Sequence, residues 1–285
     1  MAALDHKIDF SFLVTVKNAN PNGDPLSGNR PRETYDGYGE ISDVCIKRKI
    51  RNRFQDLGEK VFVQSADRAD DGYNSLHARA EGCSALKAII KGKKTDPAAY
   101  AAIACQEWID VRTFGQVFAF KGENVSVGVR GPVSIQPAIS ASPVDVVSMQ
   151  ITKSVNGEKT EGRSSDTMGM KHFVDFGMYV IHGSVNCQLA EKTGFSAEDA
   201  ALLKEAIKTL FENDCSSARP EGSMEVCRLY WWEHDSKTPK YSSAKVHRQL
   251  KIKQKADVSR PRSFFDYDIT LEALDGLNAE VIDLI

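Results

Sequence analysis

Periodic apolar segments follow one another along this chain in the order strand, helix, strand, strand, helix, strand. The first segment, Ile8–Val16, has an apolar residue at every second position, the period of a strand with one buried face. Asp43 is expected to cap an amphipathic helix that runs to about Leu57, since apolar residues recur there at spacings of three or four. A second helix is expected over Ser196–Asn213, because Ser-Ala-Glu-Asp is a capping-box start. Few folds accommodate this order.

The remaining core strands are expected at Val125–Val133, Phe173–Val185 and Met224–Trp232. A further β-rich stretch, Val144–Val155, leads to Asn156-Gly157, a dipeptide typical of hairpin turns. Without two insertions, this is the split βαβ order of a ferredoxin-like domain. The sequence therefore predicts an α+β fold. One insertion, with helical patterns near 83–91 and 97–109, follows the first helix, and the other separates the second and third strands.

Composition excludes several classes of protein. The 285 residues are 41% hydrophobic and 27% charged, which is ordinary for a globular chain and argues against disorder. No uninterrupted apolar stretch is long enough for a membrane span, and the first residues lack the pattern of a signal peptide, so a soluble cytoplasmic protein is expected. The six cysteines are scattered without a Cys-x-x-Cys pair, which predicts reduced thiols, no structural metal and no cofactor.

Charge is unevenly distributed along the chain, although the formal net charge is only −2. The segment 237–262 carries nine bases and one acid, whereas 263–285 carries six acids and no base. Such segregation can form a basic stripe for a polyanion and an acidic face elsewhere. The alternative for each block is an ordinary solvated surface.

A polar loop rich in glycine and proline, residues 17–42, separates the first strand from the first helix. A connection of this length without periodicity is usually functional or disordered. Its side chains Asn20 and Asn22 can offer hydrogen-bond donors, and Arg30 and Arg32 can each bind phosphate oxygens with a planar fork. The phosphate-loop pattern Gly-x-x-x-x-Gly-Lys-Ser/Thr is absent. A surface loop of stacked turns is the alternative.

Two further stretches carry chemistry suited to RNA. The segment Asp110–Phe118 places Arg112 and Gln116 beside Phe114, which can grip a sugar–phosphate backbone or stack a base. The alternative is that Phe114 packs in the core and that Arg112 pairs with an acid. The helix over 43–57 leaves its basic residues on the side opposite its apolar stripe; these are Lys47, Arg48 and Arg51.

The stretch Gly131–Ser140, leading on to Ser165–His172, places two methionines in a polar region. Met168 and Met170 are candidates for an apolar wedge between bases, with docking on the core as the alternative. Signs of catalysis are weak, because serine-hydrolase and zinc-protease motifs are absent. Only His172 and His247, which lie beside basic residues, are expected to contact RNA, and the loop residues Asp24, Asp36 and Asp166 form a weak metal signal.

Taken together, the loop 18–32, the basic helix 43–54, and the segments 110–118, 131–143 and 165–172 resemble the backbone subunit of type I CRISPR Cascade complexes, within the RAMP superfamily. The similarity is greatest to the subtype I-C form and extends over most of residues 8–190. It implies a ferredoxin-like (RRM-like) palm with a helical finger insertion and a β-hairpin thumb insertion. The implied division is 1–57 and 111–140 for the first palm parts, 58–110 for the finger, 141–172 for the thumb, 173–235 for the second half of the palm, and 236–285 for the basic segment and acidic tail.

The resemblance also implies a function. Copies of such a subunit stack head to tail along a guide crRNA, contact it without regard to sequence, and display it for pairing with target DNA beside other Cascade subunits, without catalysis, cofactor or membrane. The residues expected to bind RNA are Asn20, Asn22, Arg30, Arg32, Lys47, Arg48, Arg51, Arg112, Phe114, Gln116, Met168, Met170, Lys171 and His172.

Two rival functions stay open at this point. Related RAMP proteins are endoribonucleases, either metal-dependent through a loop aspartate, for which Asp24 or Asp36 would serve, or dependent on a histidine. The other rival is a single-stranded RNA chaperone that binds RNA one to one.

Overall fold

A computed structural model describes residues 2–90, 96–120, 126–152 and 168–285 of this chain. Its strands are β1 (Ile8–Ala19), β2 (Gly23–Asp24), β3 (Arg30–Pro31), β4 (Tyr38–Ile41), β5 (Gly115–Ala119), β6 (Ser126–Arg130), β7 (Val133–Ile135), β8 (Ala138–Pro143), β9 (Val146–Thr152), β10 (Met168–Val185), β11 (Met224–Glu233), β12 (Leu250–Gln254), β13 (Tyr267–Leu271) and β14 (Ala279–Asp283). Its α-helices are α1 (Asp43–Asp56), α2 (Leu76–Gly82), α3 (Ser84–Ile90), α4 (Pro97–Glu107), α5 (Ile109–Phe114), α6 (Cys187–Thr193), α7 (Ala197–Lys208) and α8 (Ser243–His247).

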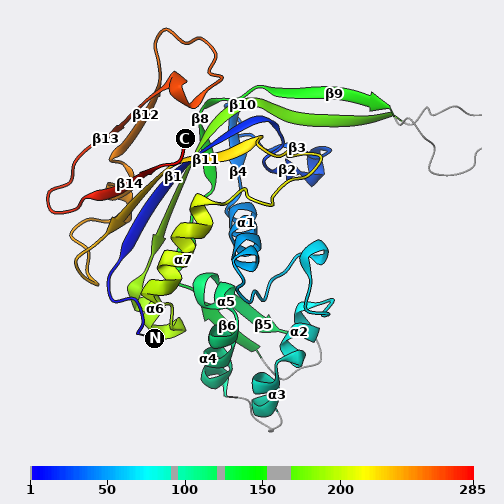
Figure 1. The fold of residues 1–285 in the computed structure, drawn as a ribbon, viewed down its shortest axis with the longest axis vertical. Helices are drawn as coiled ribbons and strands as arrows, with labels where there is room; N and C mark the ends of the chain where they lie inside the picture. The colour runs from blue at the N-terminus through cyan, green and yellow to red at the C-terminus, as the bar shows by residue number, and fades with distance from the viewer. Residues whose placement is uncertain (1, 91–95, 121–125, 153–167) are drawn as a thin grey trace, which may run out of the picture.

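A mixed α/β architecture is organised around one antiparallel sheet, in which the strands lie in the order β14-β11-β1-β10-β8-β4 (Figure 1). β7 and β9 also pair with β10. The long β1 is central, and pairs with β10 from Ile8↔Val185 to Ala19↔Val174 and with β11 from Ile8↔Glu233 to Val16↔Met224. The prediction of a strand over 8–16 is confirmed, and the strand continues three residues further, into the region expected to be a loop.

The period-two pattern of β1 divides its side chains between two cores. Phe10, Phe12 and Val14 are buried in the main core, together with residues of α1 and α7, whereas Leu13 faces a second core on the other side of the sheet. Trp231 stacks on Phe10 with ring centroids 5.4 Å apart. Alternation therefore reflects burial of both faces, since the sheet is covered on each side.

Both long helices of the main core begin at serine caps. The expectation that Asp43 caps α1 is wrong, because the Ser42 side chain accepts the hydrogen bond from the Cys45 amide and Asp43 is the first helical residue. In α7 the predicted capping box between Ser196 and Asp199 is confirmed. This helix ends at Lys208, before the expected end at residue 213, and Thr209 caps it.

The C-terminal segment covers the second face of the sheet. The side chains of Leu13, Met178 and Trp232 are buried there against Val246 of α8 and Tyr267 of β13. The strands β12, β13 and β14 were not anticipated from the sequence, and β14 joins the main sheet beside β11.

Contacts within this segment reduce the separation of charge that the sequence shows. Lys240 Nζ lies 2.7 Å from a carboxylate oxygen of Asp275, and Arg260 pairs with Asp145 at 2.8 Å. Lys251 lies 3.9 Å from Glu272. The expected uniform basic stripe is therefore partly neutralised by acids that fold back onto it.

A third core lies at the end of the molecule away from β9, as Figure 1 shows. Phe62 packs on Trp108 and Phe118 with ring centroids 4.6 and 5.0 Å away. The helical patterns expected near 83–91 and 97–109 are confirmed as α3 and α4. None of the helices in the described residues is long and apolar enough to cross a membrane.

Candidate nucleic-acid interface

A β-hairpin projects from the sheet where β9 pairs with the first part of β10 (Figure 1). The register runs from Val146↔Val174 to Thr152↔Met168, and the hairpin dipeptide Asn156-Gly157 lies outside the described residues. Met168 and Met170 are 64% and 56% exposed. The expected alternative, in which the two methionines dock on the core, does not hold in this structure.

The alternation of β10 places Met168, Met170 and His172 on one face of the hairpin, because their register partners share that face. Lys171 lies on the opposite face, as do Met149 and Ile151, which are 48% and 47% exposed. Both faces of the hairpin therefore present apolar side chains beside a basic or titratable one.

The loop 17–42 meets the hairpin through a bridging serine. Arg30 Nη1 donates to Ser148 Oγ at 2.7 Å, and Ser148 Oγ lies 2.8 Å from His172 Nδ1. Two stretches that the sequence predicted to bind RNA, more than 100 residues apart, are thus brought together. Ser148 was missed in the sequence because only the register of the hairpin places it opposite His172.

A surface groove with a cavity of about 350 Å³ lies at this junction. Its lining consists of Asn20, Gly28, Asn29, Ile151, Met170, Lys171, His172, Ser217 and Ala218. Backbone at Gly28 and Asn29 turns through positive φ angles of 62° and 61°. A cation, polar groups and apolar side chains in one groove suit both the phosphates and the bases of a single strand.

The two predicted asparagines hold the loop in place. Asn20 is buried, and its amide nitrogen donates to the Asn29 carbonyl oxygen at 2.7 Å. Asn22 Oδ1 accepts from the amide and the hydroxyl of Ser42 at 2.9 and 2.8 Å, which ties the loop to the start of α1. Arg32 lies 3.5 Å from Asp24. These contacts shape the groove from behind.

The basic residues of α1 are occupied within the protein. Lys47 pairs with Asp43 at 2.8 Å, and Arg48 donates to the Val63 carbonyl oxygen at 2.5 Å. Burial and the charge of Arg51 lower the pKa of the Arg48 guanidinium. Arg51 pairs with the buried Asp110 at 3.0 Å.

The second predicted stretch, 110–118, is also engaged internally. Arg112 donates from Nε and Nη2 to both oxygens of Asp199, at 2.8 to 3.1 Å, so the expectation that this arginine pairs with an acid is confirmed. Phe114 packs against Phe54 and lies beneath the Arg51 guanidinium at 5.0 Å. Gln116 donates to the Val117 carbonyl oxygen. None of these residues lines the groove at the hairpin.

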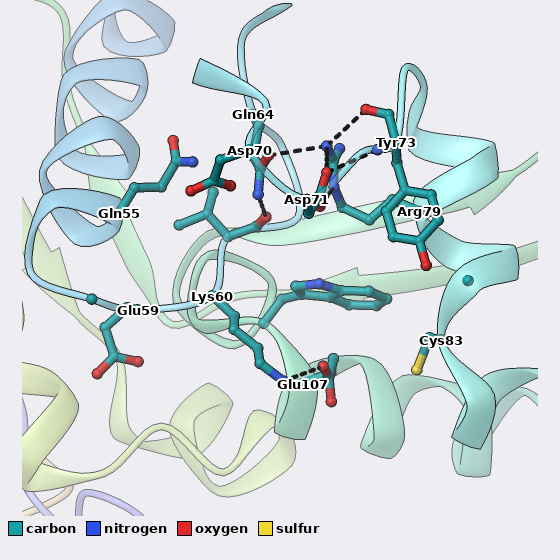
Figure 2. Close-up of a pocket in the computed structure, with 14 residues that line it drawn as sticks. Gln55, Glu59, Lys60, Gln64, Asp70, Asp71, Tyr73, Arg79, Cys83 and Glu107 are labelled. Carbon is teal, nitrogen blue, oxygen red and sulfur yellow. Dashed lines mark hydrogen bonds and ion pairs between the residues drawn. The ribbon is translucent and has the colours of Figure 1, made fainter.

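A larger cavity, of about 420 Å³, lies between the end of α1 and the finger helices (Figure 2). Its cations are paired, since Lys60 contacts Glu107 at 2.8 Å and Arg79 contacts Asp71 at 2.9 Å. Glu59 and Asp70 also line it. This acidic lining disfavours a polyanion, so the groove at the hairpin is the better candidate for nucleic acid.

The candidate catalytic residues do not assemble. Asp24 accepts from the amide of Leu26 and the hydroxyl of Ser27, which fold its own turn, and Asp36 is exposed. Asp166 lies outside the described residues. Within the described ranges there is no group of three or more His, Cys, Asp or Glu side chains that could hold a metal ion.

Comparisons with known proteins agree in pointing to one family. The family described as CRISPR-associated protein Cas7 matches residues 6–272. A CRISPR-associated protein Cas7 of Haloferax volcanii is 25% identical over 250 residues, which are 79% of this chain and 69% of the relative. The fold is similar to that of a chain in a pre-nicking CRISPR RNA-guided surveillance complex, with 18% identity, coverage of 84% of this chain and 81% of that chain, and a TM-score of 0.50. A chain of another CRISPR RNA-guided surveillance complex matches with 17% identity over 79% of this chain and 68% of that chain, at a TM-score of 0.46.

Proposed function

We propose that this chain, which belongs to the CRISPR-associated Cas7 family, binds a guide crRNA in the groove between the loop 17–42 and the hairpin. The observation that carries the proposal is the Arg30–Ser148–His172 bridge, which unites the loop and the hairpin into one surface. Lys171 supplies a cation in the same groove. Contacts of this kind go to phosphates and sugars, so binding is independent of the guide sequence.

The fold supports a ferredoxin-like palm with two insertions. In the sheet, β11, β1, β10 and β7 lie side by side as antiparallel neighbours, and α1 and α7 pack in one core. This is the strand order of a split βαβ domain if β11 is the fourth strand and β10 the third. The proposal keeps the finger at 58–110 and the thumb hairpin at 141–172.

Among the fourteen residues expected to bind RNA, we assign direct contact to Arg30, Lys171, His172, Met168 and Met170. The exposed methionines would wedge between bases, as apolar side chains do in other nucleic-acid complexes. The remaining residues hold the groove or the finger in place, since their side chains are engaged with protein groups. They are Asn20, Asn22, Arg32, Lys47, Arg48, Arg51, Arg112, Phe114 and Gln116.

Assembly completes the proposal. Copies would contact head to tail, and such a heterologous interface that does not close produces an open filament whose length the RNA sets. The segments of guide between thumbs would pair with target DNA, beside other subunits of a type I Cascade, of the I-C form, in the cytoplasm. No catalytic step is assigned to the chain. An endoribonuclease of the RAMP type, using Asp24, Asp36 or His172, is the alternative that the test must separate.

Light scattering after size-exclusion chromatography tests the proposal, with single-stranded RNAs of increasing length and unrelated sequence. We expect the mass to rise in whole-subunit steps with RNA length while the RNA stays intact. The variant Lys171→Glu should weaken this assembly, whereas Lys253→Glu, at an exposed lysine of β12, should not. A fixed one-to-one complex would instead indicate an RNA chaperone, and shortened RNA a nuclease.

A further inference from the structure

A cluster of buried polar side chains lies on the face of the central sheet that the C-terminal segment covers. β1 contributes Asp9 and Ser11, β10 contributes His182, and α8 contributes His247, while His234 follows β11. Asp9 and Ser11 have no exposed surface, and His234 and His247 are 5% and 6% exposed. None of these side chains lines the groove at the hairpin, so the proposed RNA binding does not account for them.

Asp9 is the fixed negative charge of the cluster. His234 Nε2 lies 2.8 Å from Asp9 Oδ2, and Lys7 Nζ lies 3.3 Å from Oδ1. Lys7 also donates to the Ser243 hydroxyl at the start of α8. Burial would raise the pKa of Asp9, but the hydrogen bond from His234 and the charge of Lys7 leave it below its usual value, so the group is a carboxylate at neutral pH.

His182 and His247 stack face to face, with ring centroids 4.6 Å apart and planes inclined by 14°. The Ser11 hydroxyl lies 2.6 Å from His182 Nδ1. His247 Nε2 lies 3.1 Å from the Gly183 carbonyl oxygen, which can only accept, so the ring proton is on Nε2. Among the described residues, His247 Nδ1 has no hydrogen-bond partner.

A second proton on either ring would disturb this arrangement. On His247 it would occupy Nδ1, a buried position with no acceptor, and charge on both stacked rings would be repulsive. Burial, together with the neighbouring His247, lowers the pKa of His182 to about 4. Burial also lowers the pKa of His247, although Asp9 opposes this from 3.8 Å. Both rings are therefore neutral at pH 7.

The elements packed around the pair differ in what they offer a charged ring. β1 and the residue before it present Asp9 and Lys7, whose charges oppose each other. β12 presents only the apolar Leu250 and Ile252 to the cavity that His182 lines. A protonated His182 would therefore face an apolar wall on the side of the C-terminal segment.

We propose that the stacked His182–His247 pair is a proton-sensitive latch, which holds α8 and the β12–β13 hairpin on the sheet while both rings are neutral and loosens them when a ring is protonated. The closed form binds fewer protons than the open form below the ordinary histidine pKa of about 6.5. Each pH unit below this value then shifts the equilibrium toward the open form by up to about tenfold for each histidine. The shift ends once the pH falls below the lowered pKa values of the closed form.

Labelling of Cys227 reports the opening directly. This thiol has no exposed surface and lies in the core beneath the C-terminal segment, whereas Cys215 is exposed and Cys105 is buried in the finger core. The full chain is treated with 4,4′-dithiodipyridine, which reacts with thiols in acid, between pH 7.5 and 4.5, and each site is quantified by peptide mass. We expect the rate at Cys227, relative to Cys215, to rise at least tenfold between pH 6.5 and 5.0 while Cys105 stays protected.

Two variants and one matched control make the test specific. His182→Phe keeps a ring in the stack but cannot be protonated, and His182→Gln does the same without a ring, so at least one of them should show a clearly reduced acid-dependent rise. His77→Gln, at a partly exposed histidine of the finger, should behave as the wild type. The proposal is overturned if Cys227 stays protected to pH 4.5, if both His182 variants keep the wild-type rise, or if Cys105 is labelled in parallel, which would mean global unfolding.

Discussion

Arg51 of α1 donates from Nε to Oδ2 of Asp110 at 3.0 Å, and the same carboxylate accepts from the amides of Phe62 and Val63. Asp110 is 1% exposed. One buried carboxylate therefore joins the first helix of the main core to two parts of the finger core. Its partner is an arginine that a sequence reader assigns to RNA.

We expect Arg51→Ala to destabilise the protein by about 3 kcal/mol, because it leaves the buried carboxylate of Asp110 without its counter-charge. Urea unfolding, followed by tryptophan fluorescence, measures the effect. Lys253→Ala, which removes an exposed lysine, is the control and should change stability by less than about 0.5 kcal/mol. Equal stability of the two variants would contradict the assigned role.

Arg112 binds Asp199 through two donors, which a lysine cannot reproduce. Arg112→Lys should therefore destabilise the protein by about 1–2 kcal/mol, and Arg112→Ala by about 3 kcal/mol. At temperatures where the variants remain folded, their affinity for RNA should equal that of the wild type within a factor of about two. A loss of affinity without a loss of stability would show instead that Arg112 contacts RNA directly.

Lys171→Glu should weaken RNA binding by about tenfold at low salt, because it removes a cation from the groove and adds an anion. The slope of log affinity against log salt should also become shallower by about 0.7, the value expected when one phosphate of a single strand is no longer neutralised. Fluorescence anisotropy with a short labelled RNA at several salt concentrations measures both quantities. Lys253→Glu makes the same change of charge outside the groove, and similar losses in both variants would argue against the groove.

Gly39 of β4 lies against the buried ring of Tyr179, and a Cβ atom there would come within 2.2 Å of the tyrosine oxygen. Gly39→Ala should destabilise the protein by about 1–3 kcal/mol, since the buried ring or the edge strand must move. Gly128→Ala is the matched control, because Gly128 also lies in a strand but has open space at its Cβ position. Thermal unfolding of the two variants should differ clearly.

Burial raises the pKa of the Cys105 and Cys227 thiols to about 11. The reactive thiolate is therefore suppressed below that pH, and alkylation by iodoacetamide at pH 8 should be at least tenfold slower at these sites than at the exposed Cys215. Peptide mass mapping over time measures the three rates. Unfolding in urea should make them equal, and equal rates in the native protein would contradict the burial.

Several elements could be predicted from the sequence because short-range patterns encode them. The alternation of β1 and the capping box of α7 involve residues within a few positions of each other. The four residues of the capping box specify a helix start without any help from distant residues. The predictions of α3 and α4 hold for the same reason.

The candidate site was only partly visible in the sequence. Residues of the loop and the hairpin were suspected separately, but nothing local indicates that Arg30 and His172 share Ser148. The occupation of Arg51 and Arg112 by acids was equally hidden, since their partners lie 59 and 87 residues away. An arginine that binds a buried carboxylate and one that binds a phosphate look alike in sequence.

The sequence by itself thus determined which segments of this protein are strands and helices, and which residue types are available to bind a polyanion. The tertiary structure decided which of those side chains are free. The physical reason is that periodicity and capping act over one or two turns of chain, whereas ion pairing and burial depend on segments brought together by the sheet. The strand β14, which pairs with β11 from the far end of an acidic tail, is such a long-range outcome.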